Sequence, residues 1–318
     1  MNVRRRLISA AAAATVTALG IATLTACGGD ATAAGTGRFD VVASFYPMAF
    51  LADRIGGNHV HVTSLTSPGQ EPHDLEISPK QIIGIEKSDA VLYLKNLQPS
   101  VDAAVAQSSV GTKIDAASLT TLEQHGNEVG GHAASHDTSK NEEASGLDPH
   151  IWLDPVRYAQ VAEGVGKAFE KADPEHAADY RKNTAALVEQ LDALDTAFKD
   201  GLARTRTKVF ITTHAAFGYL AERYGLTEEA INGLDPESEP SAARVKDLET
   251  MARADGVSTV FYETLVSDKT ARTIAADAGL RTDVLDPIEG ITGKSRGKDY
   301  FAVQQANLKA LRTALGAE

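Results

Sequence analysis

The feature that most restricts the fold is a long amphipathic stretch between two series of alternating short apolar runs and helical patterns. Residues Asp173–Glu175 have the composition of a helix start, and apolar residues then recur at helical spacing from Tyr180 to about Leu202. Neither Gly nor Pro interrupts residues 175–200. At 1.5 Å per residue, such a helix would be roughly 40 Å long. It is long enough to run along two domains and join them.

The residues before this stretch alternate between strand and helix patterns. Apolar runs predict strands at 39–44, 60–65 and 90–94. A helix is predicted at 48–56, and another starts at Ser78, where a capping box is combined with a proline in the first turn. A further helix follows Asp154 and ends near Ala172. This order favours an α/β lobe with a mostly parallel sheet.

The residues after the stretch repeat the pattern. Strands are predicted at 208–213, 259–262 and 283–285, with helices at 216–224, 241–255, 267–278 and 300–315. We therefore predict an α/β fold of two similar lobes with mostly parallel sheets, joined by one long backbone helix. The predicted boundaries are 39–173 for the first lobe, 174–204 for the linking helix and 205–318 for the second lobe.

The N-terminal residues have the pattern of an export signal. Three arginines at 4–6 precede an apolar stretch at 7–24, which predicts a signal peptide over residues 1–26. The stretch ends in Leu-Thr-Ala before Cys27, the only cysteine, so a lipid attached to Cys27 and a flexible tether over 27–38 are expected. A plain signal peptide with an incidental cysteine is the alternative, and the export route stays open.

Composition excludes several classes of protein. The formal net charge of −12 disfavours binding to nucleic acid. A single cysteine excludes an intramolecular disulfide and a cysteine-based zinc knuckle.

Residues 120–149 interrupt the alternating pattern. They contain His125, His132 and His136 among acidic, Gly and Ser residues, without periodicity. A loop of this length is either functional or disordered. We expect its histidines to capture metal loosely, the alternative being a solvated insertion without a metal role.

Four residues have positions suited to a metal site: His73, His150, His214 and Asp286. Three of them, His73, His214 and Asp286, follow predicted strands, and ligands of open α/β sheets bind beyond the carboxyl ends of strands. Three imidazoles and one carboxylate can form a closed tetrahedral zinc site. Each histidine taken alone is more often structural, so the surrounding motifs carry more weight than the spacing.

Six motifs resemble the metal-specific solute-binding lipoproteins of bacterial ABC transporters, especially their zinc branch. The motifs are Ser44–Pro47, Glu71–Pro79, Asp148–Pro155, Thr213–Tyr219, Glu237–Ser241 and Leu285–Ile288. They occur in the order of the family, and the similarity extends from Phe39 to the C-terminus. The Asp-Pro-His and Thr-His-Ala-Ala-Phe strings are the specific ones.

The resemblance implies a metal buried between two lobes, with His73, His150, His214 and Asp286 as its ligands. Manganese-type relatives usually carry a carboxylate at the position of His214, so the histidine favours zinc. Some zinc members have a carboxylate directly before the first histidine. Here that position is a proline, so Glu71 or water could share the fourth place. Glu263 is expected to support the site without binding the metal.

The resemblance predicts the zinc-binding component of an ABC importer, which captures Zn²⁺ between its lobes and delivers it to a permease and its ATPase. We expect a monomer, exported and lipid-anchored to the outer face of the cytoplasmic membrane. A manganese or iron carrier of the same family is the first alternative, and a secreted zinc hydrolase or an adhesin is less favoured. We do not expect an enzyme, because the chain has no His-Glu-x-x-His string and because a fourth protein ligand argues against catalytic turnover.

Overall fold

The computed structural model describes residues 37–125 and 146–317. The predicted signal peptide, the lipid attachment at Cys27, nearly all of the tether, and the loop histidines His132 and His136 lie outside the described residues. Residues 38–318 form one compact unit.

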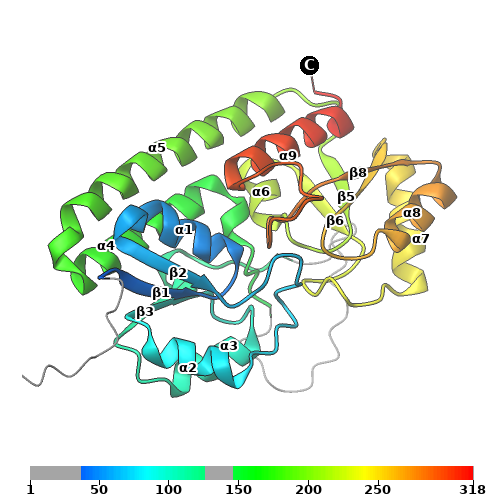
Figure 1. Cartoon of the computed structure of the whole chain (residues 1–318). Helices are drawn as coiled ribbons and strands as arrows, with labels where there is room; N and C mark the ends of the chain where they lie inside the picture. The colour runs from blue at the N-terminus through cyan, green and yellow to red at the C-terminus, as the bar shows by residue number, and fades with distance from the viewer. Residues whose placement is uncertain (1–36, 126–145, 318) are drawn as a thin grey trace, which may run out of the picture. The chain divides into compact units, whose positions relative to one another are not determined.

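Two four-stranded parallel sheets form the framework of this unit (Figure 1). The first contains β1 (Phe39–Ala43), β2 (Val60–Ser64), β3 (Ala90–Tyr93) and β4 (Thr112–Asp115) in the order β2-β1-β3-β4. The second contains β5 (Val209–Thr212), β6 (Thr227–Ala230), β7 (Thr259–Tyr262) and β8 (Arg281–Val284) in the order β6-β5-β7-β8. The strand order is the same in both sheets, which confirms the prediction of two similar parallel α/β lobes.

The helices of the first lobe share a proline in their first turn. They are α1 (Tyr46–Gly56), α2 (Pro79–Lys87), α3 (Pro99–Gln107) and α4 (Pro155–Ala172). Proline suits this position because its missing N–H would be unpaired there in any case. The predicted capping box is formed at α2, where the side chains of Ser78 and Gln81 bond each other's backbone N–H. Three 3-10 turns accompany these elements, at Gly57–His59, Ala116–Leu119 and Ile151–Leu153.

The helices of the second lobe are α6 (Gly218–Arg223), α7 (Ala242–Ala254), α8 (Lys269–Ala278) and α9 (Tyr300–Leu315). The predicted boundaries of α7, α8 and α9 agree with the structure to within two residues. Helix α6 is two residues shorter at its start than predicted, because the residues after β5 form a turn that carries His214.

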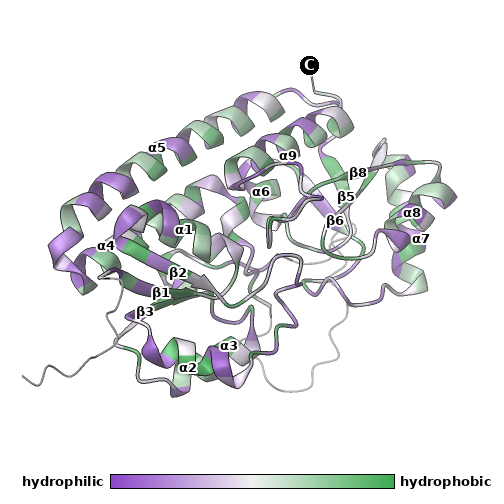
Figure 2. Cartoon of the chain, in the orientation of Figure 1, coloured by the Kyte–Doolittle hydropathy of each residue, from purple (hydrophilic) through white to green (hydrophobic). Residues whose placement is uncertain are grey.

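The predicted linking helix is present as α5 (Ala177–Leu202), preceded by a 3-10 turn at Pro174–His176. Its 26 residues correspond to about 39 Å. It packs against α1 and α4 of the first lobe and α9 of the second (Figure 1). Hydrophobic and hydrophilic residues alternate along it in Figure 2, as expected of a helix with one buried face. Among the described residues, no helix is long and apolar enough to cross a membrane.

The two lobes share their main hydrophobic core. One cluster of buried side chains includes Leu92 of the first sheet, Phe210 and Phe261 of the second, and Leu191 of α5. Tyr300 of α9 belongs to the same cluster, and its hydroxyl donates to the carbonyl oxygen of Trp152 in the first lobe at 2.6 Å. Separating the lobes would expose this core, so the fold favours a fixed arrangement of the lobes over a wide hinge motion.

Candidate metal centre

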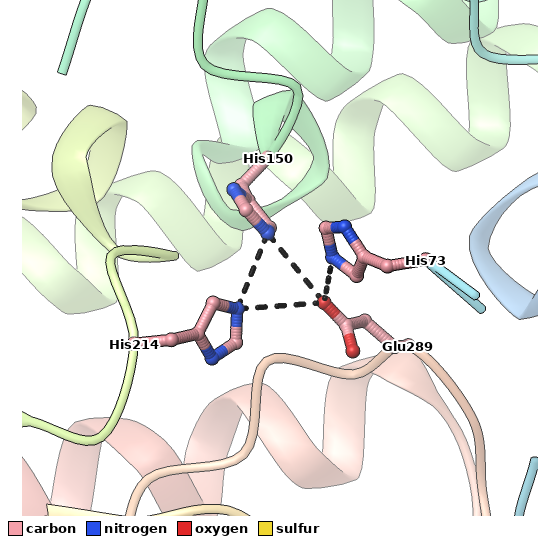
Figure 3. Close-up of side chains that lie close together, drawn as sticks. All are labelled: His73, His150, His214 and Glu289. Carbon is pink, nitrogen blue, oxygen red and sulfur yellow. Dashed lines mark hydrogen bonds and ion pairs between the residues drawn. The ribbon is translucent and has the colours of Figure 1, made fainter. Parts of the chain in front are cut away.

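Three imidazoles and one carboxylate converge at a single point, shown in Figure 3. The Oε1 atom of Glu289 lies 3.2 Å from Nε2 of His73, 3.5 Å from Nε2 of His150 and 3.7 Å from Nε2 of His214. The Nε2 atoms of His150 and His214 are 3.4 Å apart. Ligands at 2.0–2.1 Å from a tetrahedral zinc ion are roughly 3.3–3.4 Å from one another. These four distances are therefore close to those of a tetrahedral zinc site, and all four ligand atoms lie within 4.8 Å of one another.

Each lobe contributes two of these side chains. His73 lies in the loop after β2, and His150 precedes α4 in the first lobe. His214 follows β5, and Glu289 follows β8 in the second lobe. His150, His214 and Glu289 are buried, whereas the side chain of His73 is 13% exposed. The structure thus brings the three predicted histidines together at the carboxyl ends of the strands, with His73 nearest to solvent.

Asp286, the predicted fourth ligand, is not part of this group. Its Oδ1 accepts the backbone N–H of Ile288 at 2.8 Å, and its Oδ2 accepts the Thr264 hydroxyl at 3.1 Å. The backbone N–H of Asp286 donates to the side chain of Asn307 at 2.9 Å. The carboxylate therefore closes the turn after β8, and Glu289 is the carboxylate that lies among the three imidazoles. Burial raises the pKa of Asp286 to about 6.

The backbone of the same turn directs Glu289 toward the imidazoles. Ile288 has φ 60°, in the left-handed region that a β-branched residue rarely adopts. Strain of this kind costs of the order of 1–3 kcal/mol and occurs mostly at functional sites. Trp152 of the first lobe holds the turn by donating its indole N–H to the carbonyl oxygen of Pro287 at 2.6 Å. The only signal for Glu289 in the sequence is its place in the loop after a strand.

Two further carboxylates orient two of the imidazoles. Asp148 accepts from Nδ1 of His150 at 2.7 Å, and Glu263 accepts from Nδ1 of His214 at 2.8 Å. With its proton on Nδ1, each ring can present the lone pair of a deprotonated Nε2 to a metal ion. Carboxylates behind metal-binding histidines have this role in many zinc sites. Glu263 thus lies beside His214 and not at the centre.

The charges of the centre stabilise one another. Burial alone would lower the pKa of His150, but hydrogen bonds to Asp148 and Glu289 outweigh it and raise that pKa to about 10. Burial alone would raise the pKa of Glu289, but hydrogen bonds from His150 and His73 hold it well below its usual range. The second oxygen of Glu289, Oε2, is buried without a hydrogen-bond partner among the described residues. A buried carboxylate with a free oxygen is suited to binding a cation.

Two further residues predicted to take part in metal binding, Glu71 and His125, lie near the metal centre. The Oε2 atom of Glu71 accepts the backbone N–H of Asp74 at 3.2 Å. Burial, and then the charge of Glu289, raise the pKa of Glu71. His125 hydrogen-bonds to Asp148 at 2.9 Å and forms a second possible metal group with Glu123 and Glu222. Neither Glu71 nor His125 belongs to the group of four.

A positively charged side chain, that of Arg157, already lies in the second possible metal group. The guanidinium of Arg157 bonds the carboxylate of Glu123 and lies 3.9 Å from that of Glu222. It also lies over the ring of Tyr219, 4.6 Å from the centroid. A metal ion would have to displace this arginine, so the group of three is a weaker candidate than the group of four.

The sequence also matches a family of known proteins. Residues 41–314 match the family described as zinc-uptake complex component A, periplasmic. The chain belongs to this family. The resemblance predicted from its motifs is thereby confirmed.

Two relatives show how far the similarity of this family member extends. The zinc-binding protein AdcA of Streptococcus pyogenes is 36% identical over 292 residues, which cover 87% of this chain and 56% of AdcA. The high-affinity zinc uptake system protein ZnuA of Bacillus subtilis is 31% identical over 305 residues, which cover 91% of this chain and 93% of ZnuA. The chain thus spans a little over half the length of AdcA and nearly all of ZnuA.

Two solved structures of related proteins have the same fold. The Zn(II)-bound ZnuA-like domain of Streptococcus pneumoniae AdcA superposes with a TM-score of 0.71 at 32% identity, covering 88% of this chain and 99% of the domain. The laminin-binding protein Lmb of Streptococcus agalactiae superposes with a TM-score of 0.75 at 28% identity, covering 87% of this chain and 99% of Lmb. The latter is described as bifunctional, with adhesin and metal transporting activity.

Proposed function

We propose that this chain is the extracytoplasmic zinc-binding component of an ABC importer. It captures Zn²⁺ between its two lobes and delivers the ion to a permease and its ATPase. The observation that carries the proposal is the group His73, His150, His214 and Glu289, whose four ligand atoms lie within 4.8 Å of one another and come from both lobes. The ion is the transported cargo, so the site must bind it tightly and later release it.

The donor set favours zinc over the alternatives in the same family. Three imidazole nitrogens and one carboxylate oxygen suit zinc, whereas manganese prefers a larger share of oxygen ligands. The four side chains also fill a tetrahedral coordination sphere, while a zinc hydrolase needs an open position for water. These properties support a carrier of zinc over a manganese carrier or an enzyme.

The proposal includes the location of the protein in the cell. A lipid on Cys27 would hold the protein at the outer face of the cytoplasmic membrane as a monomer beside the permease. One relative, from Streptococcus pneumoniae, is named a zinc-binding lipoprotein. Adhesion, named for Lmb, is the second candidate activity for this chain.

The stiffness of the fold limits how the ion enters. Helix α5 and the shared core connect both lobes, so we expect the loops to move more than the lobes. His73 is the most exposed of the four side chains and is carried by a loop. We infer that this loop opens the path to the site.

Metal analysis of the protein purified without chelator tests the proposed function. We expect one zinc ion per chain, and a competition titration should show that zinc displaces manganese. The matched control is a chain in which His73, His150 and His214 are all replaced by alanine, which should carry no stoichiometric zinc. Binding of manganese in preference to zinc, or equal zinc content in the control, would contradict the proposal.

Zinc affinity is expected to fall as the pH falls. Protons and zinc compete for the same Nε2 atoms, and the raised pKa of His150, about 10, means that a proton must leave even above neutral pH. Affinity should change by up to about tenfold per pH unit for each proton displaced. Competition titrations between pH 6 and 8, with calorimetry in buffers of different ionisation enthalpy, measure the affinity and the protons released. An affinity independent of pH over this range would show that the imidazoles are not the ligands.

A further inference from the structure

His125 lies just before residues 126–145, and its imidazole hydrogen-bonds to the carboxylate that orients His150. The Nδ1 atom of His125 is 2.9 Å from Oδ2 of Asp148. The other oxygen, Oδ1, accepts from Nδ1 of His150 at 2.7 Å and from its backbone N–H at 2.9 Å. Asp148 therefore uses one oxygen for each histidine. The three side chains form a continuous hydrogen-bonded chain that ends at a proposed zinc ligand.

Residues of the second lobe leave space for the side chain of His125. A Cβ atom built on Gly218 would lie 2.4 Å from the Cβ of His125, so the imidazole occupies space that only a glycine leaves free. The ring packs edge-on against Tyr219, with 4.4 Å between ring centroids and 82° between planes.

Tyr219 also holds the backbone on both sides of this contact. Its hydroxyl donates to the carbonyl oxygen of Asp148 at 2.7 Å and accepts the backbone N–H of Glu123 at 2.9 Å. The position of His125 is thus fixed by packing and by its neighbours' hydrogen bonds.

Because Asp148 is buried, losing its hydrogen bond to His125 would cost free energy. Its side chain has no exposed surface, whereas that of His125 is 18% exposed. Without His125, Oδ2 of Asp148 would lose its donor, and a buried oxygen without a partner is costly. The carboxylate can reduce that cost by rotating, which would weaken its hydrogen bond to His150.

We infer that His125 is a positioning residue for the zinc site, and that it acts on His150 through Asp148. The inference rests on the proposed function. It gives His125 a different role from the capture of metal expected for residues 120–149.

The test compares variants that keep or remove the donor. His125→Phe keeps a ring against Gly218 and Tyr219 but removes the N–H that bonds Asp148. We expect its zinc affinity to fall about tenfold, at the lower end of the range for partners of metal-binding histidines. His125→Asn restores a donor and should recover part of the loss. The cobalt(II)-loaded His125→Phe variant should show a shifted visible absorption spectrum, because the orientation of His150 changes.

Two controls separate this role from other effects. Glu222→Gln removes the carboxylate 3.4 Å from Nε2 of His125 without touching Asp148, and should leave zinc affinity unchanged. Deletion of residues 126–145 keeps His125, and it should also leave the zinc affinity unchanged. If His125→Phe does not fold, His125→Ala is compared with His125→Asn in the same assays.

The outcomes distinguish this inference from the proposed function. Equal zinc affinity and equal cobalt spectra for His125→Phe and the unchanged chain would overturn the inference alone. Equal losses in the Phe and Asn variants would also overturn it, because the donor would not matter. Failure of the unchanged chain to bind zinc would overturn the proposed function first.

Discussion

Replacing His214 by alanine is expected to weaken zinc binding at least about a thousandfold, or roughly 4 kcal/mol of binding free energy. The substitution removes an Nε2 atom that lies 3.4 Å from that of His150 and 3.7 Å from Oε1 of Glu289. It also leaves the buried carboxylate of Glu263 without the Nδ1 partner that it contacts at 2.8 Å. Competition with a zinc chelator of known affinity measures the loss.

A histidine on the surface provides the matched control for this variant. The side chain of His61 is 54% exposed and contacts only Asp40 among the hydrogen bonds of the described residues. His61→Ala removes the same chemical group without reaching the metal centre, so its zinc affinity should equal that of the unchanged chain. Unchanged affinity in His214→Ala would remove His214 from the site and leave two imidazoles, too few for the proposed donor set.

The elements with strong local signals are those that the sequence predicts well. Strand β7 has the predicted bounds, 259–262, because a run of β-branched and aromatic residues lies between Ser258 and Glu263. The capping box of α2 fixes its start at Pro79 for a similar reason. His214, in the loop after β5, can be predicted from the sequence for a related reason. Residues that follow a parallel strand lie at the edge of the sheet where ligands bind.

The elements that the sequence does not predict are mostly polar. Strands β4 and β6 have the sequences Thr-Lys-Ile-Asp and Thr-Glu-Glu-Ala, and both lie at the edges of their sheets. An edge strand is paired on one side only and does not require an apolar run. Helix α3 buries only Val101 and Val105, so its apolar face is too small to show a period. The proposed lobe boundaries remain predictions, because one core crosses them.

Which carboxylate lies among the imidazoles depends on a turn that local patterns do not reveal. Asp286 and Glu289 both follow β8, and both are buried acids. Their roles are separated by the positive φ of Ile288 and by the hydrogen bond from its N–H to Asp286. The sequence therefore identifies the loop that supplies the carboxylate, while the backbone conformation decides which carboxylate reaches the imidazoles.

Glu289→Gln is expected to weaken zinc binding by about a hundredfold or more, or roughly 3 kcal/mol. The amide has the same shape, but it replaces the negative charge that lies 3.2–3.7 Å from the three Nε2 atoms with a neutral group. A neutral amide is a weaker zinc ligand than a carboxylate. The same chelator competition measures the loss, and the cobalt(II) spectrum should shift because an anionic ligand is lost.

Asp286→Asn is the matched control, because it makes the same chemical change in the same loop. The asparagine Oδ1 can still accept the N–H of Ile288, so the turn should persist and the loss of zinc affinity should stay below about tenfold. A larger loss in Asp286→Asn than in Glu289→Gln would reverse the assignment. Asp286 would then be the ligand expected from the sequence, and the turn at Ile288 would have to rearrange when zinc binds.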